Sequence, residues 1–328
     1  MRLGLWHSCA GLLVSAIMGG QVALAADQAA YPSRTVSIVV PTTPGGTADL
    51  LARLIAPKLS TMWGHTVIVE NKPGAGSLVG TDYVARAKPD GYTLLLTFNE
   101  MATLPAINKN AKVDVVNDFE RIGKIGTLPV VILANPRVKA NTLQELIEEA
   151  RQNPGKLTYA SNGSGGVLQL YTEMFKQEAK VDIMHIPYKG ALEASMAMLS
   201  GEVDVLVQFA SGNVQNYVKE NRTKPYAVAS RERLPGLPNV PTTAEAGLPS
   251  LQLEAWYGMF APAGTPNSII EKVNKDFAEV MQMPDVRERV KGLGMTVDTS
   301  TPEEFDAYFK EEYRRWTDLI VSAGIQSN

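Results

Sequence analysis

The sequence predicts an α/β protein built from two similar lobes. Short apolar strands alternate with amphipathic helical patterns along most of the chain, which is typical of α/β folds. A strand, a glycine-rich turn and a helix follow one another at residues 35–55, and the same order returns at residues 157–175. The chain has 328 residues, of which 45% are hydrophobic, so it is long enough for about two domains.

Residues 1–25 have the three-part layout of an export signal. Arg2 supplies the positive start, Ala10 to Val22 is apolar, and Ala23-Leu24-Ala25 matches an A-x-A cleavage site. The apolar run is too short to span a membrane. We therefore expect a signal peptide and an exported, soluble mature chain that begins at Ala26. The alternative is a buried or anchoring N-terminal helix.

Composition argues against several classes of function. The one cysteine, Cys9, lies in the predicted signal, so the mature chain would have no disulfide, no thiolate catalysis and no cysteine metal site. The formal net charge is −3, and loss of Arg2 with the signal makes it −4, which gives no support to a nucleic-acid partner. Two histidines remain, His65 and His185, without a carboxylate cluster nearby in sequence. We expect no metal and no cofactor, and a structural His185 with one ring nitrogen bonded to the backbone.

The first strand, at residues 35–40, leads into a glycine-rich loop at residues 41–49. Gly45 and Gly46 allow the backbone to approach a ligand closely, because no Cβ stands in the way. The helix that follows offers unpaired N–H groups and a positive dipole end, which suit an anion. A tight turn without a ligand is the alternative. Pro57 is expected to kink or end this helix.

A second strand at residues 67–69 precedes a loop at residues 71–76, after which Ser77 is a candidate helix cap. The turn Pro89-Asp90-Gly91 then introduces a buried strand that ends at Phe98. Phe98 is either a stacking partner for a ligand or a core residue.

Two long strand-like stretches are predicted to cross between the lobes, at residues 122–135 and 253–262. The boundaries between the two lobes are expected within these crossing strands. Lobe 1 is predicted to comprise residues 26–128 and 257–328, and lobe 2 residues 129–256.

The second lobe repeats the glycine-rich loop at Ser161 to Gly166, after a strand at residues 157–160. Its two hydroxyls, three glycines and following helix offer several N–H and O–H donors to a carboxylate. The loop lacks the first glycine of a nucleophile elbow and the lysine of a phosphate loop. A flexible turn is the alternative.

Asp204 lies at the head of a later apolar strand, at residues 203–209. A buried acid needs a partner. Asp204 therefore either accepts hydrogen bonds from a ligand or from ordered water, or faces solvent at the end of the strand. Other strands and helices are predicted at residues 181–186, 191–199, 226–229, 266–282, 285–292 and 302–323.

Several short motifs follow one another in a distinctive order. They are Pro44-Gly45-Gly46-x-x-Asp49, Val69 to Gly76, Lys88 to Leu94, His185 to Gly190, Gly201 to Asp204, and Pro241-Thr242 followed by Glu245-Ala246-Gly247. Each motif is weak, but the ordered set is specific and covers nearly the whole mature chain. In this set the sequence resembles the periplasmic solute receptors of the tripartite tricarboxylate transporter family, the Bug type.

The resemblance implies a two-lobe Venus-flytrap periplasmic binding protein with crossing strands, which is a monomeric receptor and not an enzyme. It implies a small organic carboxylate ligand, which we expect to be a di- or tricarboxylate, held by the two loops and by bridging waters. A membrane permease of two subunits would receive the ligand. The sequence departs from the family pattern at Thr42, where an aromatic residue is usual, and at residues 97–101. A smaller side chain at Thr42 with Phe98 nearby favours a bulkier, aromatic carboxylate.

The predicted ligand-binding residues are Thr42, Thr43, Gly45, Gly46, Thr47, Asp49, Phe98, Ser161, Gly163, Ser164, Gly165, Gly166 and Asp204. No catalytic residue is predicted. Two alternatives stay open: an exported hydrolase that uses Ser161 or Ser164 with a base in hydrogen-bond reach, and a sensor that signals to a membrane kinase. The sequence does not distinguish transport from signalling, or an aliphatic from an aromatic ligand.

Overall fold

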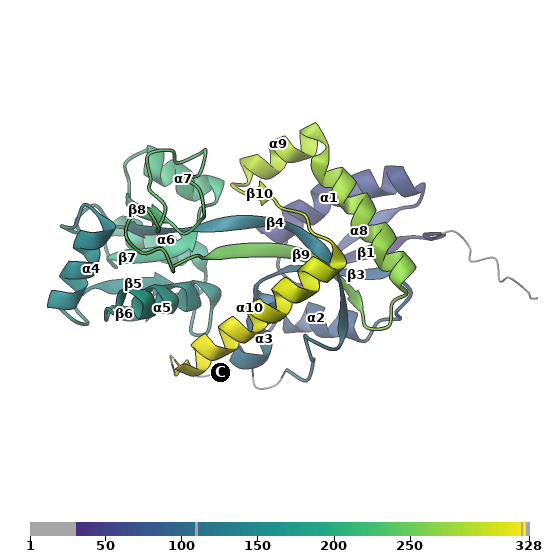
Figure 1. The fold of residues 1–328 in the computed structure, drawn as a ribbon, viewed down its shortest axis with the longest axis horizontal. Helices are drawn as coiled ribbons and strands as arrows, with labels where there is room; N and C mark the ends of the chain where they lie inside the picture. Colours follow the sequence, from purple (N-terminus) through teal and green to yellow (C-terminus); the bar gives the residue numbers. More distant parts are fainter. Residues whose placement is uncertain (1–30, 109–110, 323, 326–328) are drawn as a thin grey trace, which may run out of the picture. The chain divides into compact units, whose positions relative to one another are not determined.

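A computed structural model describes residues 31–108, 111–322 and 324–325 (Figure 1). The predicted signal peptide lies outside these residues. The strands are β1 (Val36–Val40), β2 (Val67–Asn71), β3 (Thr93–Phe98), β4 (Phe119–Ala134), β5 (Thr158–Ser161), β6 (Met184–Pro187), β7 (Val205–Phe209), β8 (Lys224–Val228), β9 (Glu254–Pro262) and β10 (Thr296–Val297). The helices are α1 (Thr47–Trp63), α2 (Leu78–Ala85), α3 (Glu100–Ile107), α4 (Leu143–Gln152), α5 (Val167–Ala179), α6 (Ala191–Ser200), α7 (Gly212–Lys219), α8 (Asn267–Gln282), α9 (Pro284–Gly292) and α10 (Pro302–Ser322).

Two groups of parallel strands are joined by two long antiparallel strands. The first strand group is β2-β1-β3 and the second is β7-β5-β6. Between them lie β9 and β4, which pair with each other over Phe119–Pro129 of β4. From Val130 to Ala134, β4 pairs instead with β7 and β8. The predicted crossing strands are therefore present, and the partners of β4 change between Pro129 and Val130 (Figure 1).

The inner parallel strands β1, β3, β5 and β7 are mostly buried because helices cover them, whereas the outer strands β2 and β6 are partly exposed. Ile38, Val39 and Val40 of β1 have no exposed surface, which matches the continuous apolar runs typical of parallel strands. α10 packs against β4, α3 and α5, as its course in Figure 1 shows. The buried α10 residue Phe305 contacts Trp256 of β9 edge to face, with 5.5 Å between ring centroids. The aromatic side chains of α10 that face the protein interior, Phe305, Phe309 and Trp316, are therefore part of the core.

Two local predictions differ from the structure. The expected end of the helix at Pro57 is wrong, since α1 continues through Pro57 to Trp63: burial of Ile55 and Leu59 on either side holds the helix although proline removes one backbone hydrogen bond. Ser77 precedes α2 in a left-handed conformation, with φ of 69°, and makes no side-chain capping bond. Helices α3 and α7, of eight residues each, were not predicted, and α3 has no clear apolar period.

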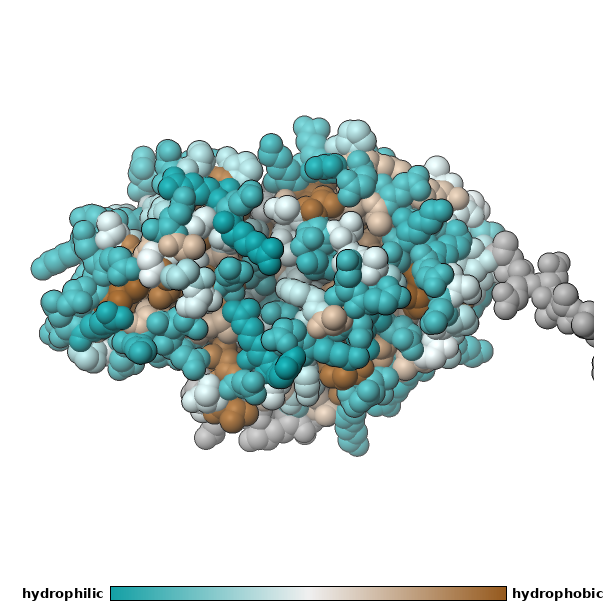
Figure 2. Space-filling view, in the orientation of Figure 1, coloured by the Kyte–Doolittle hydropathy of each residue, from teal (hydrophilic) through white to brown (hydrophobic). Residues whose placement is uncertain are grey.

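The face drawn in Figure 2 is mostly hydrophilic, with hydrophobic side chains in small, separate patches. In the part of the chain that the structure describes, no helix has both the length and the apolar character needed to cross a membrane.

Candidate ligand-binding site

A cavity of about 360 Å³ lies between segments that follow strands of both groups. One wall comes from the loop after β2 and from α3, and the other from the loop after β5 and the start of α5. The lining residues are Ala75, Gly76, Glu100, Leu104, Ile107, Asn108, Asn162, Ser164, Gly165, Gly166 and Val167. Ligands of open α/β sheets bind beyond the carboxyl ends of the strands, and this cavity lies beyond those of β2, β3 and β5.

The loop at Ser161 to Gly166, called the second loop below, is stabilised by hydrogen bonds to itself and to the start of α5. Gly163 and Gly165 have φ of +113° and +77°, which other residues rarely adopt. The Gly165 N–H donates to Gln169 Oε1 at 2.6 Å, and the Gly166 N–H to the Gly163 carbonyl at 3.1 Å. These predicted anion donors are therefore used within the loop.

Ser164 differs from the other residues of the second loop. It is exposed, lines the cavity, and neither its N–H nor its hydroxyl has a hydrogen-bond partner among the described residues. It follows that Ser164 is the residue of this loop best able to donate to a ligand.

Ser161 is fully buried and does not line the cavity. Its Oγ lies 2.6 Å from His185 Nε2, and it also bonds to the backbone of Gly163. The prediction that a His185 ring nitrogen bonds to the backbone is wrong, since the partner is this hydroxyl. The His185 ring stacks on Tyr159 at 4.8 Å, and burial lowers the pKa of His185, so the imidazole is neutral at pH 7.

This pair bears on the hydrolase alternative, because it places a base within reach of a loop serine. A catalytic histidine is usually oriented by a third group, and among the described residues no carboxylate hydrogen-bonds to His185. Ser164 does face the cavity, but among the described residues no basic side chain hydrogen-bonds to it. The geometry therefore favours a structural role for the Ser161–His185 pair, which stabilises the second loop.

The loop at Pro41 to Thr47, called the first loop below, is organised by a buried carboxylate. Asp49 accepts hydrogen bonds from the Gly45 N–H (2.9 Å), from Asn71 Nδ2 (2.9 Å) and from Arg53 Nε (3.0 Å). Burial raises the pKa of Asp49, but these bonds together outweigh it and hold the pKa below its ordinary value. Asp49 and the Gly45 N–H, both predicted to contact the ligand, therefore bind each other.

The exposed part of the first loop is Thr43 to Gly46. These residues do not line the 360 Å³ cavity. β1 nevertheless lies between β2 and β3 in the sheet, and Asn71 Nδ2 also donates to the Thr42 carbonyl at 3.2 Å. The first loop is thereby fixed beside the loop after β2, whose residues 75 and 76 do line the cavity.

Unsatisfied polar atoms gather near the ends of β1 and β3. Thr42 Oγ1, Thr97 Oγ1 and Asn99 Oδ1 are buried and have no hydrogen-bond partner among the described residues. Most buried polar atoms are paired in proteins, so these three atoms are candidates for hydrogen bonds to a ligand. The atoms lie in the two segments where the sequence departs from the family pattern.

Phe98 is half-buried and stacks on Tyr257 of β9, with ring centroids 5.8 Å apart. Burial raises the pKa of the Tyr257 hydroxyl, and a hydrogen bond with Thr47 opposes this rise. Phe98 and Thr47 are thus joined through Tyr257, which sequence reasoning missed because it comes from a distant crossing strand.

Glu100, the first residue of α3, was also missed. Its half-buried side chain lines the cavity, and its Oε2 accepts a hydrogen bond from the Ser77 hydroxyl at 2.6 Å. Burial raises the pKa of Glu100, which the Ser77 bond only partly offsets. The neighbouring Asn99 donates from Nδ2 to the Tyr171 hydroxyl of α5 at 2.8 Å, a direct link between the two walls. The only signal for Glu100 in the sequence was the unusual segment 97–101.

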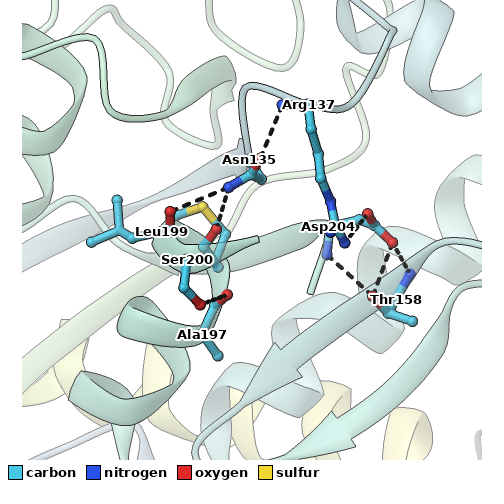
Figure 3. A network of polar contacts seen from close by, with 8 residues as sticks. Asn135, Arg137, Thr158, Ala197, Leu199, Ser200 and Asp204 are labelled. Carbon is cyan, nitrogen blue, oxygen red and sulfur yellow. Dashed lines mark hydrogen bonds and ion pairs between the residues drawn. The ribbon is translucent and has the colours of Figure 1, made fainter. Parts of the chain in front are cut away.

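Asp204 lies away from the cavity, at the amino end of β7 (Figure 3). Its carboxylate pairs with Arg137 at 2.9 Å and accepts two hydrogen bonds from Thr158, at the amino end of β5. β5 and β7 are parallel, and Asp204 precedes β7 whereas the second loop follows β5. Asp204 and the second loop therefore lie at opposite ends of these strands. The structure does not bring Asp204 together with the other predicted site residues.

Two groups of parallel strands, two crossing strands and a cavity at the carboxyl ends of the strands define the class of two-lobe solute-binding proteins. The chain belongs to the tripartite tricarboxylate transporter receptor family, whose model matches residues 51–325. The periplasmic binding protein BugD is 35% identical, with a TM-score of 0.75 over 91% of this chain and 100% of BugD. The predicted family and fold are confirmed.

Two similar structures carry ligands. MatC (Rpa3494) from Rhodopseudomonas palustris, solved with malate, is 32% identical, with a TM-score of 0.75 over 88% of this chain and 100% of MatC. Rpa4515 from R. palustris, solved with adipate, is 29% identical, with a TM-score of 0.79 over 91% of this chain and 100% of Rpa4515. The chain is thus a periplasmic-type receptor of a family in which small carboxylates are bound.

Proposed function

We propose that this protein binds a small organic carboxylate in the cavity between α3 and the second loop and delivers it to a membrane permease. The observation that carries the proposal is the cavity itself, with the unpartnered donors of Ser164 on one wall. A volume of about 360 Å³ suits a small molecule. The malate and adipate complexes of the two relatives support a carboxylate ligand.

The ligand carboxylate docks on the second loop, where Ser164 and the amino end of α5 supply neutral donors and a positive dipole end. The exposed residues of the first loop and the Phe98–Tyr257 pair complete the site when the lobes close. Contacts from both lobes exist only in the closed form, so the ligand shifts the population toward it. Asp49 and Ser161 hold the two loops, and Asp204 has no part in the site.

The topology and the sequence also support several organisational proposals. The change in the partners of β4 at Pro129 supports lobe boundaries at residues 26–128 with 257–328, and at 129–256. The signal-like layout of residues 1–25 supports export of a periplasmic mature chain, and we propose that this chain acts as a monomer.

The direct test is a thermal-shift and calorimetric screen of aliphatic and aromatic mono-, di- and tricarboxylates. A ligand present at 100 times its Kd stabilises the protein by about 2.7 kcal/mol, which is easily seen. The proposal expects such a shift for at least one carboxylate, and loss of the shift when Ile107, on the opposite wall of the cavity, is changed to Trp. Absence of any response across the panel would contradict it.

A hydrolase is the second candidate, because Ser161 and His185 are in hydrogen-bond contact. The receptor proposal expects no ester turnover by the wild-type protein. Turnover that disappears in both Ser161→Ala and His185→Gln would favour the hydrolase. Transport and signalling differ in the partner, so uptake by membranes that carry the permease, with and without the receptor, distinguishes them.

A further inference from the structure

One charged side chain stands out in the cavity. Among the described residues that line it, Glu100 alone is charged, and neither lysine nor arginine is present. The described lining of a cavity proposed to hold an anion thus contains a carboxyl group and no cation. The site must hold both groups without repulsion between them.

Nothing in the described part of the chain neutralises Glu100. Its Oε2 accepts from the Ser77 hydroxyl, and Oε1 has no hydrogen-bond partner there. No salt bridge reaches the Glu100 carboxyl group, and no positive charge favours its ionised form. One oxygen of the group therefore remains to accept a hydrogen bond from a ligand.

The position of Glu100 in α3 also matters. An acidic residue at the first position of a helix occupies the positive end of the helix dipole. The amino end of α3 is therefore not an additional anion site, and the donors that suit a carboxylate are on the opposite wall, in the second loop. The two walls have opposite chemical preferences.

We propose that Glu100 makes this receptor select a carboxylate that also carries an ammonium group, with the carboxylate on the second loop and the ammonium on Glu100. This inference rests on the proposed function and names its ligand class. A dicarboxylate in the same orientation would put its second carboxylate against Glu100, which requires uptake of a proton. An aminocarboxylate meets both walls without a proton change.

The test compares ligands that differ only at the end facing Glu100. The pairs are 4-aminobutanoate with glutarate, and 5-aminopentanoate with adipate, together with the common α-amino acids, measured by calorimetry at pH 7.5. The wild-type protein is expected to bind at least one aminocarboxylate about tenfold or more tighter than any dicarboxylate of the panel, since one charged hydrogen bond is worth about that factor.

Glu100→Gln is the central variant. The amide keeps the shape of the side chain and an oxygen for Ser77 but loses the charge, so the preference is expected to fall by about tenfold or more, mainly through weaker binding of the aminocarboxylate. Ser77→Ala is the matched control. It removes the bond between Ser77 and Glu100 but keeps the charge, so the preference is expected to persist. If Glu100 were only a structural partner of Ser77, the two variants would behave alike.

Three outcomes would overturn the inference. The wild-type protein prefers a dicarboxylate, Glu100→Gln leaves the preference unchanged, or a dicarboxylate binds without uptake of a proton, as measured in buffers of different ionisation enthalpy. Tyr257, which lies within electrostatic range of Glu100, keeps its proton because burial raises its pKa, so uptake would report on Glu100. If no carboxylate of either kind binds, the proposed function fails as well, and the two failures are thereby distinguished.

Discussion

The two glycine-rich loops share a sequence pattern but are stabilised in different ways. Each follows a parallel strand and precedes a helix, α1 for the first loop and α5 for the second. The first loop is held by the ionised Asp49, and the second by the neutral pair of Ser161 and His185 and by side-chain amides. In the second loop most of the donors expected for an anion serve the loop itself, and in the first loop the Gly45 N–H does so. The donors left over, such as those of Ser164, decide what can bind.

The largest effect should come from removing the carboxylate of the first loop. Asp49→Ala leaves the Gly45 N–H, Asn71 and Arg53 without their acceptor, so it is expected to lower the free energy of unfolding by about 3 kcal/mol. Ser161→Ala removes neutral hydrogen bonds only, and about 1 kcal/mol is expected. Urea denaturation of both variants measures the difference. Equal losses would show that charge is not what separates the two loops.

A second comparison uses the glycine that precedes each helix. A Cβ on Gly166 would collide with Asn162 Oδ1, so Gly166→Val is expected to cost about 2 kcal/mol. A Cβ on Gly46 would lie 3.7 Å from its nearest neighbour, so Gly46→Val should leave stability unchanged within about 0.5 kcal/mol.

Gly46→Val also has a consequence for binding. Its side chain should block the approach of a ligand to the first loop and abolish carboxylate binding, as calorimetry would show. Unchanged affinity in a folded Gly46→Val protein would remove the first loop from the site.

A smaller effect is expected from Ser164→Ala, which removes one exposed hydroxyl and keeps the N–H. Affinity for the carboxylate should fall about fivefold, which corresponds to about 1 kcal/mol, with no change in the melting temperature. Thr43→Ala is the counterpart in the first loop. A larger loss for Thr43→Ala than for Ser164→Ala would reverse the assignment of the carboxylate to the second loop.

The gentlest test changes only pH. The pKa of Asp49 is lowered by folding, so its stabilisation is full above the unfolded-state pKa of about 3.9 and is lost as pH falls through the folded-state value. The pKa of His185 is lowered too, so its neutral form favours the native state above about pH 6.5, and stability falls as pH drops from there toward the folded-state pKa.

The second loop should therefore weaken as pH falls below about 6.5, and the first loop only near pH 4 and below. Hydrogen exchange of the amides of each loop, followed across this range, measures the two profiles separately. His185→Gln should remove the pH dependence of exchange in the second loop below about pH 6.5. Asp49→Asn should remove that of the first loop near pH 4 and below. Loops that weaken together would contradict the assignment of these two groups.

The sequence allowed much of the framework to be predicted, because it depends on local patterns. Glycines in an order of strand, turn and helix identified both loops, and apolar period two and period 3.6 located most elements. The helix did not end at Pro57 as predicted, because burial of its neighbours outweighs the cost of one missing backbone hydrogen bond. Asp204 misled because its strand has two ends, and only pairing with β5 shows which of them faces the second loop.

The residues that were missed meet only through the fold. Ser161 and His185 are 24 residues apart, and Ser77 and Glu100 are 23 apart, so no local pattern joins them. Tyr257 reaches Phe98 from a crossing strand. These contacts are set by the register of the strands, which single-sequence patterns do not specify.

The central claim is that the cavity between α3 and the second loop is where the ligand carboxylate binds. A crystal structure of the protein with a carboxylate that responds in the thermal screen tests it most directly. The account predicts the ligand in this cavity, with a carboxylate oxygen about 2.7–3.1 Å from the N–H or hydroxyl of Ser164. A ligand held elsewhere, with Ser164 left exposed to solvent, would contradict it.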